Sequence, residues 1–210
     1  MSKPRSSSFL NMESLKFQWL IKKSLALAIL AVIGGLCEPG SAEAVSNKHL
    51  VASESATLPP SGAAKLCQTY RWACTHDSRV RTISEQVVHA IAQVNRRVNQ
   101  TVRYISDQRQ FNTPDHWSLP TARGGDCEDY ALLKKQKLLE IGFPPQALLI
   151  ATVLDKNRSG HAVLVVRTSD GDLILDNVTD RILPWAETGY LFLRMQDPQA
   201  PTRWVSVIGS

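Results

Sequence analysis

The stretch Gly-Gly-Asp-Cys-Glu-Asp-Tyr at residues 124–130 places a cysteine at the start of a predicted helix. Residues 130–141 follow with apolar side chains at helical spacing, and Gly142 and Pro144 are typical of a helix end. Cys127 therefore lies in the first turn, where unpaired backbone N–H groups and the positive end of the helix dipole favour a thiolate. A cysteine nucleophile requires such a position.

The two glycines before this helix permit a tight turn and a close approach of the backbone to a substrate. Within the helix, the apolar stripe is formed by Leu132, Leu133, Leu138 and Leu139. The lysines of the helix are predicted to face water: Lys134, Lys135 and Lys137. The pattern thus predicts an amphipathic helix with one buried face.

The first 44 residues have the pattern of a secretory signal peptide. Lys22 and Lys23 precede an apolar run at residues 24–36, and Ala-Glu-Ala at residues 42–44 resembles a signal peptidase site. The run holds about a dozen residues, fewer than a helix needs to cross a bilayer core of roughly 30 Å. We therefore expect cleavage of residues 1–44, a periplasmic location and no membrane span in the mature chain. An uncleaved N-terminal anchor is the alternative.

The basic composition does not indicate nucleic acid as a partner. The chain has 24 Lys and Arg against 19 Asp and Glu, a net charge of +5. Five of these bases and three of these acids lie in residues 1–44, so the excess falls to +3 after cleavage. The sequence has no basic stripe interleaved with aromatic residues, which would indicate a nucleic-acid-binding surface.

The cysteine count leaves at least one free thiol in the mature chain. Cys67, Cys74 and Cys127 remain after cleavage, and an odd number cannot all pair within one chain in an oxidising compartment. Cys67 and Cys74 are close enough in sequence to close a short loop, which would leave Cys127 free. The alternative is three unpaired core residues. Zinc binding fits less well, because the spacing is unusual and no fourth soft ligand lies nearby.

The rest of the chain predicts a flexible arm at residues 45–64, rich in Ser, Ala and Pro, and one folded domain at residues 65–210. A helix capped by Thr82 or Ser84 is expected to run to about residue 102. Later runs of β-branched and aliphatic residues predict strands at 147–154, 161–166, 173–175, 191–195 and 203–207. Helices followed by an antiparallel sheet predict an α+β fold, with a helix packed on one sheet face.

His161 and Asp176 provide a base for the thiol, and a group that orients that base, if they meet across neighbouring strands. A four-residue loop that pairs Val166 with Gly171 would place His161 opposite Asp176, with Cβ atoms about 5 Å apart. A two-residue loop at 170–171 would displace the pair by four positions, about 13 Å. We therefore expect the longer loop or an equivalent bulge. Taken singly, His161 could be an ordinary strand histidine and Asp176 a turn former.

The chain resembles the bacterial transglutaminase-like cysteine proteinases over about residues 66–207. Four motifs carry the resemblance: Gly-Gly-Asp-Cys-Glu-Asp-Tyr-Ala at 124–131, Gly-His-Ala-Val-Leu at 160–164, Leu-Ile-Leu-Asp-Asn at 173–177 and Ile-Leu-Pro-Trp at 182–185. The resemblance implies a papain-like, transglutaminase-like α+β core. It also implies that Cys127 is the nucleophile, His161 the general base and acid, and Asp176 the orienting group.

The acids beside the cysteine, Asp126, Glu128 and Asp129, should raise the pKa of its thiol. One explanation is that acids complement the positive end of a helix. The other is a Ca²⁺ site, because calcium takes hard oxygen ligands and would cancel the negative charge. The resemblance to LapG-type periplasmic proteases implies calcium, bound through Asp126 and Glu128 and less directly through Asp129.

The sequence thus predicts a periplasmic cysteine endopeptidase. The resemblance implies an exported adhesin-type substrate at the cell surface, cut at a small-residue site, and an inner-membrane receptor that senses cyclic di-GMP as a regulator. Two alternatives remain: amine-accepting acyl transfer or cell-wall peptide amidase activity on the same fold, and a calcium-stabilised binding module without activity. For the oxyanion we expect the Cys127 backbone N–H and a second donor, with residues 112–117 as a candidate source.

Overall fold

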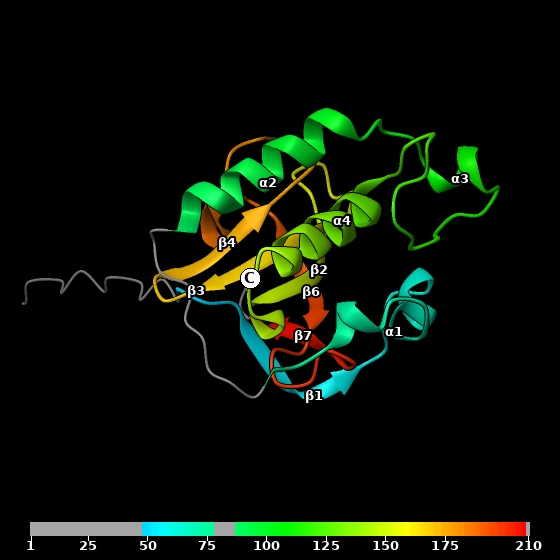
Figure 1. The fold of residues 1–210 in the computed structure, drawn as a ribbon. Helices are drawn as coiled ribbons and strands as arrows, with labels where there is room; N and C mark the ends of the chain where they lie inside the picture. Colours follow the sequence, from blue (N-terminus) through cyan, green and yellow to red (C-terminus); the bar gives the residue numbers. More distant parts are fainter. Residues whose placement is uncertain (1–47, 78–86, 209–210) are drawn as a thin grey trace, which may run out of the picture. The chain divides into compact units, whose positions relative to one another are not determined.

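A computed structural model of the protein describes residues 48–77 and 87–208 (Figure 1). The predicted signal peptide at residues 1–44 and the two predicted helix caps, Thr82 and Ser84, lie outside these ranges. The longer described helices are α2 (Val88–Thr101) and α4 (Cys127–Glu140), and the shorter ones are α1 (Leu66–Thr69) and α3 (Asp107–Gln110).

The strands form one antiparallel sheet in the order β1-β7-β6-β2-β3-β4-β5. Their bounds are β1 Val51–Thr57, β2 Leu148–Leu154, β3 Gly160–Thr168, β4 Gly171–Leu175, β5 Leu183–Pro184, β6 Leu191–Gln196 and β7 Trp204–Ile208. Each strand predicted from the aliphatic runs is present within two residues. Helices on an antiparallel sheet confirm the predicted α+β class.

The central strands are apolar on both faces because both faces are buried. Along β2, Leu148 and Ile150 belong to one core, whereas Leu149 and Val153 belong to another. Successive strand residues point to opposite faces, so these cores lie on either side of the sheet. The first core is completed by Leu132 and other residues of α4, and Figure 1 shows α4 in front of the central strands with α2 beside it.

The predicted flexible arm at residues 45–64 is wrong for Val51–Thr57, which form β1. This strand pairs antiparallel with β7, from Val51 opposite Ile208 to Thr57 opposite Trp204. Because β1 is an edge strand and mostly exposed, its small polar residues bury little apolar surface. The alternating hydrophobic pattern that reveals a half-buried strand is therefore absent from its sequence.

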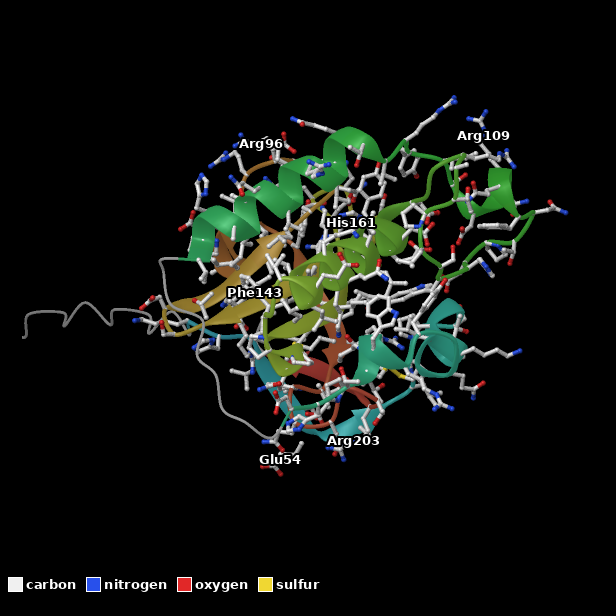
Figure 2. The ribbon with its side chains drawn as sticks, in the orientation of Figure 1. Glu54, Arg96, Arg109, Phe143, His161 and Arg203 are labelled. Carbon is white, nitrogen blue, oxygen red and sulfur yellow. A yellow bond between two sulfur atoms is a disulfide. The ribbon has the colours of Figure 1, made fainter. Side chains whose placement is uncertain are left out.

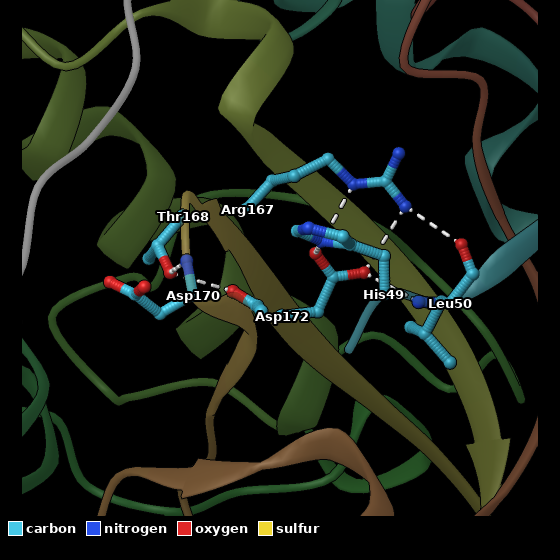
Figure 3. Close-up of polar contacts among 7 residues, drawn as sticks. His49, Leu50, Arg167, Thr168, Asp170 and Asp172 are labelled. Carbon is cyan, nitrogen blue, oxygen red and sulfur yellow. Dashed lines mark hydrogen bonds and ion pairs between the residues drawn. The ribbon is translucent and has the colours of Figure 1, made fainter. Parts of the chain in front are cut away.

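A buried carboxylate ties the chain before β1 to the hairpin of β3 and β4 (Figure 3). Asp172 is fully buried, and its oxygens lie 2.9 Å from His49 Nδ1 and accept the Leu50 backbone N–H at 2.8 Å. Arg167 bonds both Asp172 and the Leu50 carbonyl oxygen. These contacts fix the start of β1 across the second face of the sheet, where Leu50 joins the core.

Cys67 and Cys74 form a disulfide, and Cys127 is the free cysteine of the described residues. The sequence left this pairing open, and the structure shows it, so the alternative of three unpaired core cysteines is wrong. The bridge closes the segment from α1 to the following 3-10 turn (Arg71–Cys74). Within it, the Tyr70 hydroxyl accepts a hydrogen bond from the Leu119 backbone N–H at 3.1 Å, so the bridged loop contacts the chain leading to α4.

The lysines of α4 do not all face water, contrary to the prediction. Lys134 and Lys135 are fully buried, whereas Lys137 is exposed and pairs with Glu140. The reason is that α4 packs against α2 as well as against the sheet, so more than one stripe of the helix is covered. Burial lowers the pKa of each buried lysine to about 7.

The two buried ammonium groups have different surroundings. Lys135 Nζ donates to Gln196 Oε1 at 2.7 Å. Lys134 Nζ lies 5.8 Å from the centre of the Tyr130 ring and has no hydrogen-bond partner among the described residues. Within residues 48–77 and 87–208, no helix has both the length and the apolarity to cross a membrane.

Replacing Lys134 with Met should raise the free energy of unfolding by about 1–3 kcal/mol at pH 7, because a desolvated ammonium without a hydrogen bond is costly. The unfolded side chain binds more protons than the folded one between pH values of about 7 and 10.5. The stabilisation should therefore be full below pH 7 and disappear towards pH 10.5. Urea unfolding at both ends of this window measures it.

The matched control is Lys137→Met on the exposed face of the same helix, which should change stability by less than about 0.5 kcal/mol. A Lys134→Met protein less stable than wild type at pH 7 would contradict the assignment.

Candidate active site

A glycine turn presses the start of α4 against the chain at Arg103. Gly124 has φ +123°, and a Cβ there would lie 1.9 Å from the Arg103 carbonyl oxygen. Gly125 donates its backbone N–H to that oxygen at 3.1 Å, and Ile105 donates to Gly125 at 3.0 Å. The glycines therefore allow two backbone segments to approach closely. One is the turn before α4, and the other is the segment at Arg103, which leads into α3.

Cys127 is the first residue of α4, where the sequence predicted a helix start, and it is only partly exposed. Its thiol donates to Glu128 Oε2 at 3.1 Å. Burial raises the pKa of the Cys127 thiol well above its ordinary value, and the negative charge of Glu128 and Asp126 raises it further, while the Ala162 backbone N–H lowers it. The helix start alone therefore does not make a thiolate here.

Cys127 and His161 line one cleft of about 340 Å³. Its other walls include Tyr104, Trp117 and Leu193, so residues far apart in the sequence meet there. Tyr104 and Leu193 are also among the large apolar side chains exposed at the surface. Figure 2 labels His161 near the end of α4 that carries Cys127.

His161 Nε2 and Asp176 Oδ1 lie 2.9 Å apart, with both side chains nearly buried. The strand register that joins them differs from both registers considered in the sequence. Thr168 pairs with Gly171 and Leu164 with Leu175, so the loop is Ser169 and Asp170.

Continued by one residue, this register places Asp176 opposite Val163, two positions from His161 on the same face. Diagonal neighbours of this kind lie within reach of long side chains. The predicted need for a four-residue loop or a bulge is therefore wrong, because the imidazole spans the diagonal.

Both oxygens of the Asp176 carboxylate are occupied. Oδ1 accepts the Val178 backbone N–H at 3.0 Å as well as bonding His161, and Oδ2 accepts the Tyr190 hydroxyl at 2.6 Å. Burial alone would raise the pKa of Asp176, but these hydrogen bonds and the charge of His161 hold it below its ordinary value. The side chain is thus kept ionised and aimed at the imidazole.

Helix α2 holds the loop that carries Asp176. Asn99 Nδ2 donates to the carbonyl oxygens of Asp176 and Thr179 and to Asp180 Oδ1, at 3.0, 3.2 and 2.9 Å. One turn earlier, Asn95 also donates to Thr179. This role was not predicted from the sequence. Its signal is a pair of asparagines four residues apart, which lie on one face of a helix.

A carboxylate that was not predicted from the sequence as a ligand, that of Asp107, lies close to those beside Cys127. One oxygen each of Asp107, Asp126 and Glu128 lies within 4.8 Å of the other two. Of the three residues predicted as metal ligands, two therefore converge with Asp107. Asp129 Oδ1 instead accepts the Ser118 backbone N–H at 2.9 Å.

Asp107 follows a serine at the start of the short helix α3, 19 residues before Asp126. The segment Tyr-Ile-Ser-Asp at 104–107 belongs to the resemblance to the family, but nothing in its spacing links it to the cysteine. The bridge between Tyr104 and Gly125 brings the two segments together.

This acid group fits a divalent cation. Burial and the charge of Asp126 raise the pKa of Glu128 to about 9, and burial and the charge of Asp126 also raise that of Asp107. Oδ1 of Asp107 and Oδ1 of Asp126 are buried without a hydrogen-bond partner in the described part of the chain. Oxygen atoms left unpaired within a convergent set of carboxylates are the ligands that calcium takes.

Comparisons with known proteins identify one family whose model matches most of the chain. The model of the family described as "Bacterial transglutaminase-like cysteine proteinase BTLCP" matches residues 53–210. No curated protein matches the chain.

Solved structures similar to the chain include those of LapG from Legionella pneumophila. One has 25% identity and a TM-score of 0.44, covering 53% of this chain and 64% of that one. The EGTA-treated form has 28% identity and a TM-score of 0.47, and the match covers 53% of this chain and 63% of that one. The calcium-bound form has 24% identity and a TM-score of 0.49, and the match covers 59% of this chain and 70% of that one. The chain thus spans less than two thirds of the first two.

Replacing Gly124 with Ala should lower the free energy of unfolding by about 3 kcal/mol, because the new Cβ meets the Arg103 carbonyl oxygen and φ is positive. The control is Gly160→Ala, next to His161, where a Cβ would meet nothing within 4 Å. It should change stability by less than about 0.5 kcal/mol. Chemical denaturation of both proteins decides, and equal effects would contradict the close-approach role of Gly124.

Proposed function

Because the chain belongs to the bacterial transglutaminase-like cysteine proteinase family, we propose that it is a periplasmic cysteine endopeptidase. The triad is Cys127, His161 and Asp176. The observation that carries the proposal is the buried 2.9 Å pair of His161 and Asp176, whose imidazole borders the same cleft as the free cysteine at a helix start.

The proposed mechanism is acyl transfer to the cysteine followed by hydrolysis. The Cys127 thiol gives its proton to His161 as Sγ attacks the scissile carbonyl carbon. His161 then protonates the leaving amine as the peptide bond breaks, which leaves a thioester. A water molecule gives a proton to His161 and attacks the thioester, and the returning proton restores the thiol.

Asp176 decides which imidazole nitrogen takes part. Its Oδ1 holds Nε2, so Nδ1 is the nitrogen left for the thiol and for the leaving group. The ionised carboxylate also stabilises the imidazolium that forms at each proton transfer. The pKa of Asp176 lies below its ordinary value, which keeps this charge present in mildly acid solution.

The oxyanion of the tetrahedral intermediate is proposed to accept the backbone N–H of Cys127, one of the unpaired donors of the first turn. The loop at residues 112–117 contributes Pro114, Asp115 and Trp117 to the cleft wall. The indole N–H of Trp117 is donated to Asp115 at 2.9 Å, so this side chain does not supply the second donor.

Calcium is the proposed cofactor, held by Asp107, Asp126 and Glu128. Their convergent oxygens and unpaired buried atoms support it. When bound, the ion would supply positive charge beside a thiol whose pKa Glu128 and Asp126 raise. Asp129, which the sequence also predicted as a ligand, follows Glu128 in the chain. Its Oδ2 is buried and has no hydrogen-bond partner among the described residues.

An exported, adhesin-type surface protein is the substrate that the family resemblance implies, and an inner-membrane receptor sensing cyclic di-GMP is the implied regulator. Both belong to this proposal. A polypeptide fits the cleft better than a small metabolite, because its wall includes the large exposed side chains of Tyr104 and Leu193.

Peptide hydrolysis in water enriched in oxygen-18 tests the proposed reaction. A mixed peptide library should give new C-termini that carry one heavy oxygen, detected by mass spectrometry. Cys127→Ala should abolish them, and His161→Ala should lower kcat/KM by about 10³-fold or more. His89→Ala, an exposed histidine on α2, should leave the rate unchanged.

Products that carry an added amine in place of heavy oxygen would assign the chain to acyl transfer instead. Absence of any Cys127-dependent product, with the calcium response intact, would leave a binding module.

Calcium should stabilise the folded protein by about 2.7 kcal/mol at a free concentration 100 times the Kd. Without the ion, the pKa of Glu128 is raised, so the folded protein binds more protons than the unfolded chain between pH values of about 4.5 and 9. Its stability therefore falls as the pH rises across this window. The gain from calcium should therefore grow across this window. Thermal unfolding in calcium and in EGTA measures it.

Asp107→Asn should remove most of this gain, although Asp107 lies far from Cys127 in sequence. Glu140→Gln removes the same charge from an exposed acid of α4 and should leave the gain unchanged. Equal calcium responses in Asp107→Asn and Glu140→Gln would overturn the proposed ligand set.

A further inference from the structure

Tyr190, which is not part of the proposed triad, forms a hydrogen bond with the Asp176 carboxylate. The Tyr190 hydroxyl donates to Oδ2 at 2.6 Å, on the oxygen that His161 does not bond. The Tyr190 ring also meets the His161 ring edge to face, with centroids 5.8 Å apart and planes at 85°. One side chain therefore contacts both partners of the buried pair.

The three side chains come from three different elements. His161 is on β3, Asp176 directly follows β4, and Tyr190 directly precedes β6. Tyr190 is itself fixed: its backbone N–H donates to Thr188 Oγ1 at 3.2 Å, and that hydroxyl donates to the Trp185 carbonyl oxygen at 2.7 Å. The phenol is thus placed by a turn that lies outside the β3–β4 hairpin.

A second cavity lies beside Asp176 and Tyr190. This cavity, of about 290 Å³, is lined by Asp176 and Tyr190, and also by Lys156 and Arg181. Its lining does not include Cys127 or His161. Although Asp176 borders this space, only 5% of its side chain is exposed. The oxygen Oδ2 of this side chain accepts the Tyr190 hydroxyl, and Tyr190 borders the same space.

We propose that Tyr190 is a positioning residue for the reaction: it fixes the Asp176 carboxylate for His161 and seals it from the second cavity. The proposal rests on the proposed cysteine peptidase function. Without the phenol, Oδ2 loses a charge-assisted hydrogen bond and gains water, and the carboxylate can rotate away from Nε2.

The charged groups around Asp176 give the sign of the expected pH effect. His161 faces it from β3, Lys134 from α4, and Asp180 lies in its own loop, while Asp155 of the β2–β3 turn acts on Tyr190. The Tyr190 hydrogen bond lowers the pKa of Asp176, so its removal raises that pKa. The acid limb of the rate profile should therefore move to higher pH.

Tyr190→Phe is the test, measured as the pH profile of peptide hydrolysis. We expect kcat to fall about tenfold at neutral pH, KM to change less than about twofold, and the acid limb to move up by about one pH unit. Tyr70→Phe is the matched control, since it removes a tyrosine hydrogen bond at the disulfide loop, away from Asp176. Its profile should match that of wild type.

Nuclear magnetic resonance of protein labelled with nitrogen-15 in histidine gives a readout that does not need a substrate. The His161 Nε2 proton, identified by its loss in His161→Ala, should shift or broaden in Tyr190→Phe and stay unchanged in Tyr70→Phe. An unchanged resonance and an unchanged pH profile would overturn the role of Tyr190. If the resonance shifts in Tyr190→Phe but the wild-type protein hydrolyses no peptide, the proposed function is overturned, and the placement of Asp176 by Tyr190 stands.

Discussion

The negative charge gathered at the first turn of α4 is the constraint on which the site depends. Asp126 and Glu128 flank Cys127, and Asp107 reaches the same point from α3. The thiol is partly buried among these acids, so burial and charge together raise its pKa. A helix start and a nearby histidine do not offset this. In the proposed account, a cation bound by these acids holds the segments within residues 103–127 together and offsets the negative charge beside the sulfur.

The other half of the site is held by hydrogen bonds rather than by excess charge. Asp176 is ionised in a buried position because His161, Val178 and Tyr190 all donate to it or pair with it. Asn99 anchors the loop behind it to α2. The two halves therefore differ in what they need: the histidine side is complete in the protein alone, whereas the cysteine side carries uncompensated carboxylates.

The sequence predicted those features that short-range patterns encode. The aliphatic runs located β2 to β4, β6 and β7, and the glycine pair and leucine spacing located α4. The proximity of Cys67 and Cys74 made a disulfide possible but did not decide it. The strand β1, the buried Lys134 and the ligand candidate Asp107 escaped, because each depends on packing between segments far apart in the chain. The diagonal of His161 and Asp176 escaped because side-chain reach, as well as register, decides that contact.

The rate of iodoacetamide reaction at Cys127, mapped by mass spectrometry between pH values of about 5 and 9, tests the central claim most directly. The account predicts fast labelling below the ordinary thiol range in calcium, and slow labelling that rises only in alkaline solution in EGTA. His161→Ala should lose the fast reaction in calcium. Identical profiles in calcium and in EGTA would contradict the claim that the acids around Cys127 must be neutralised before the thiol can react.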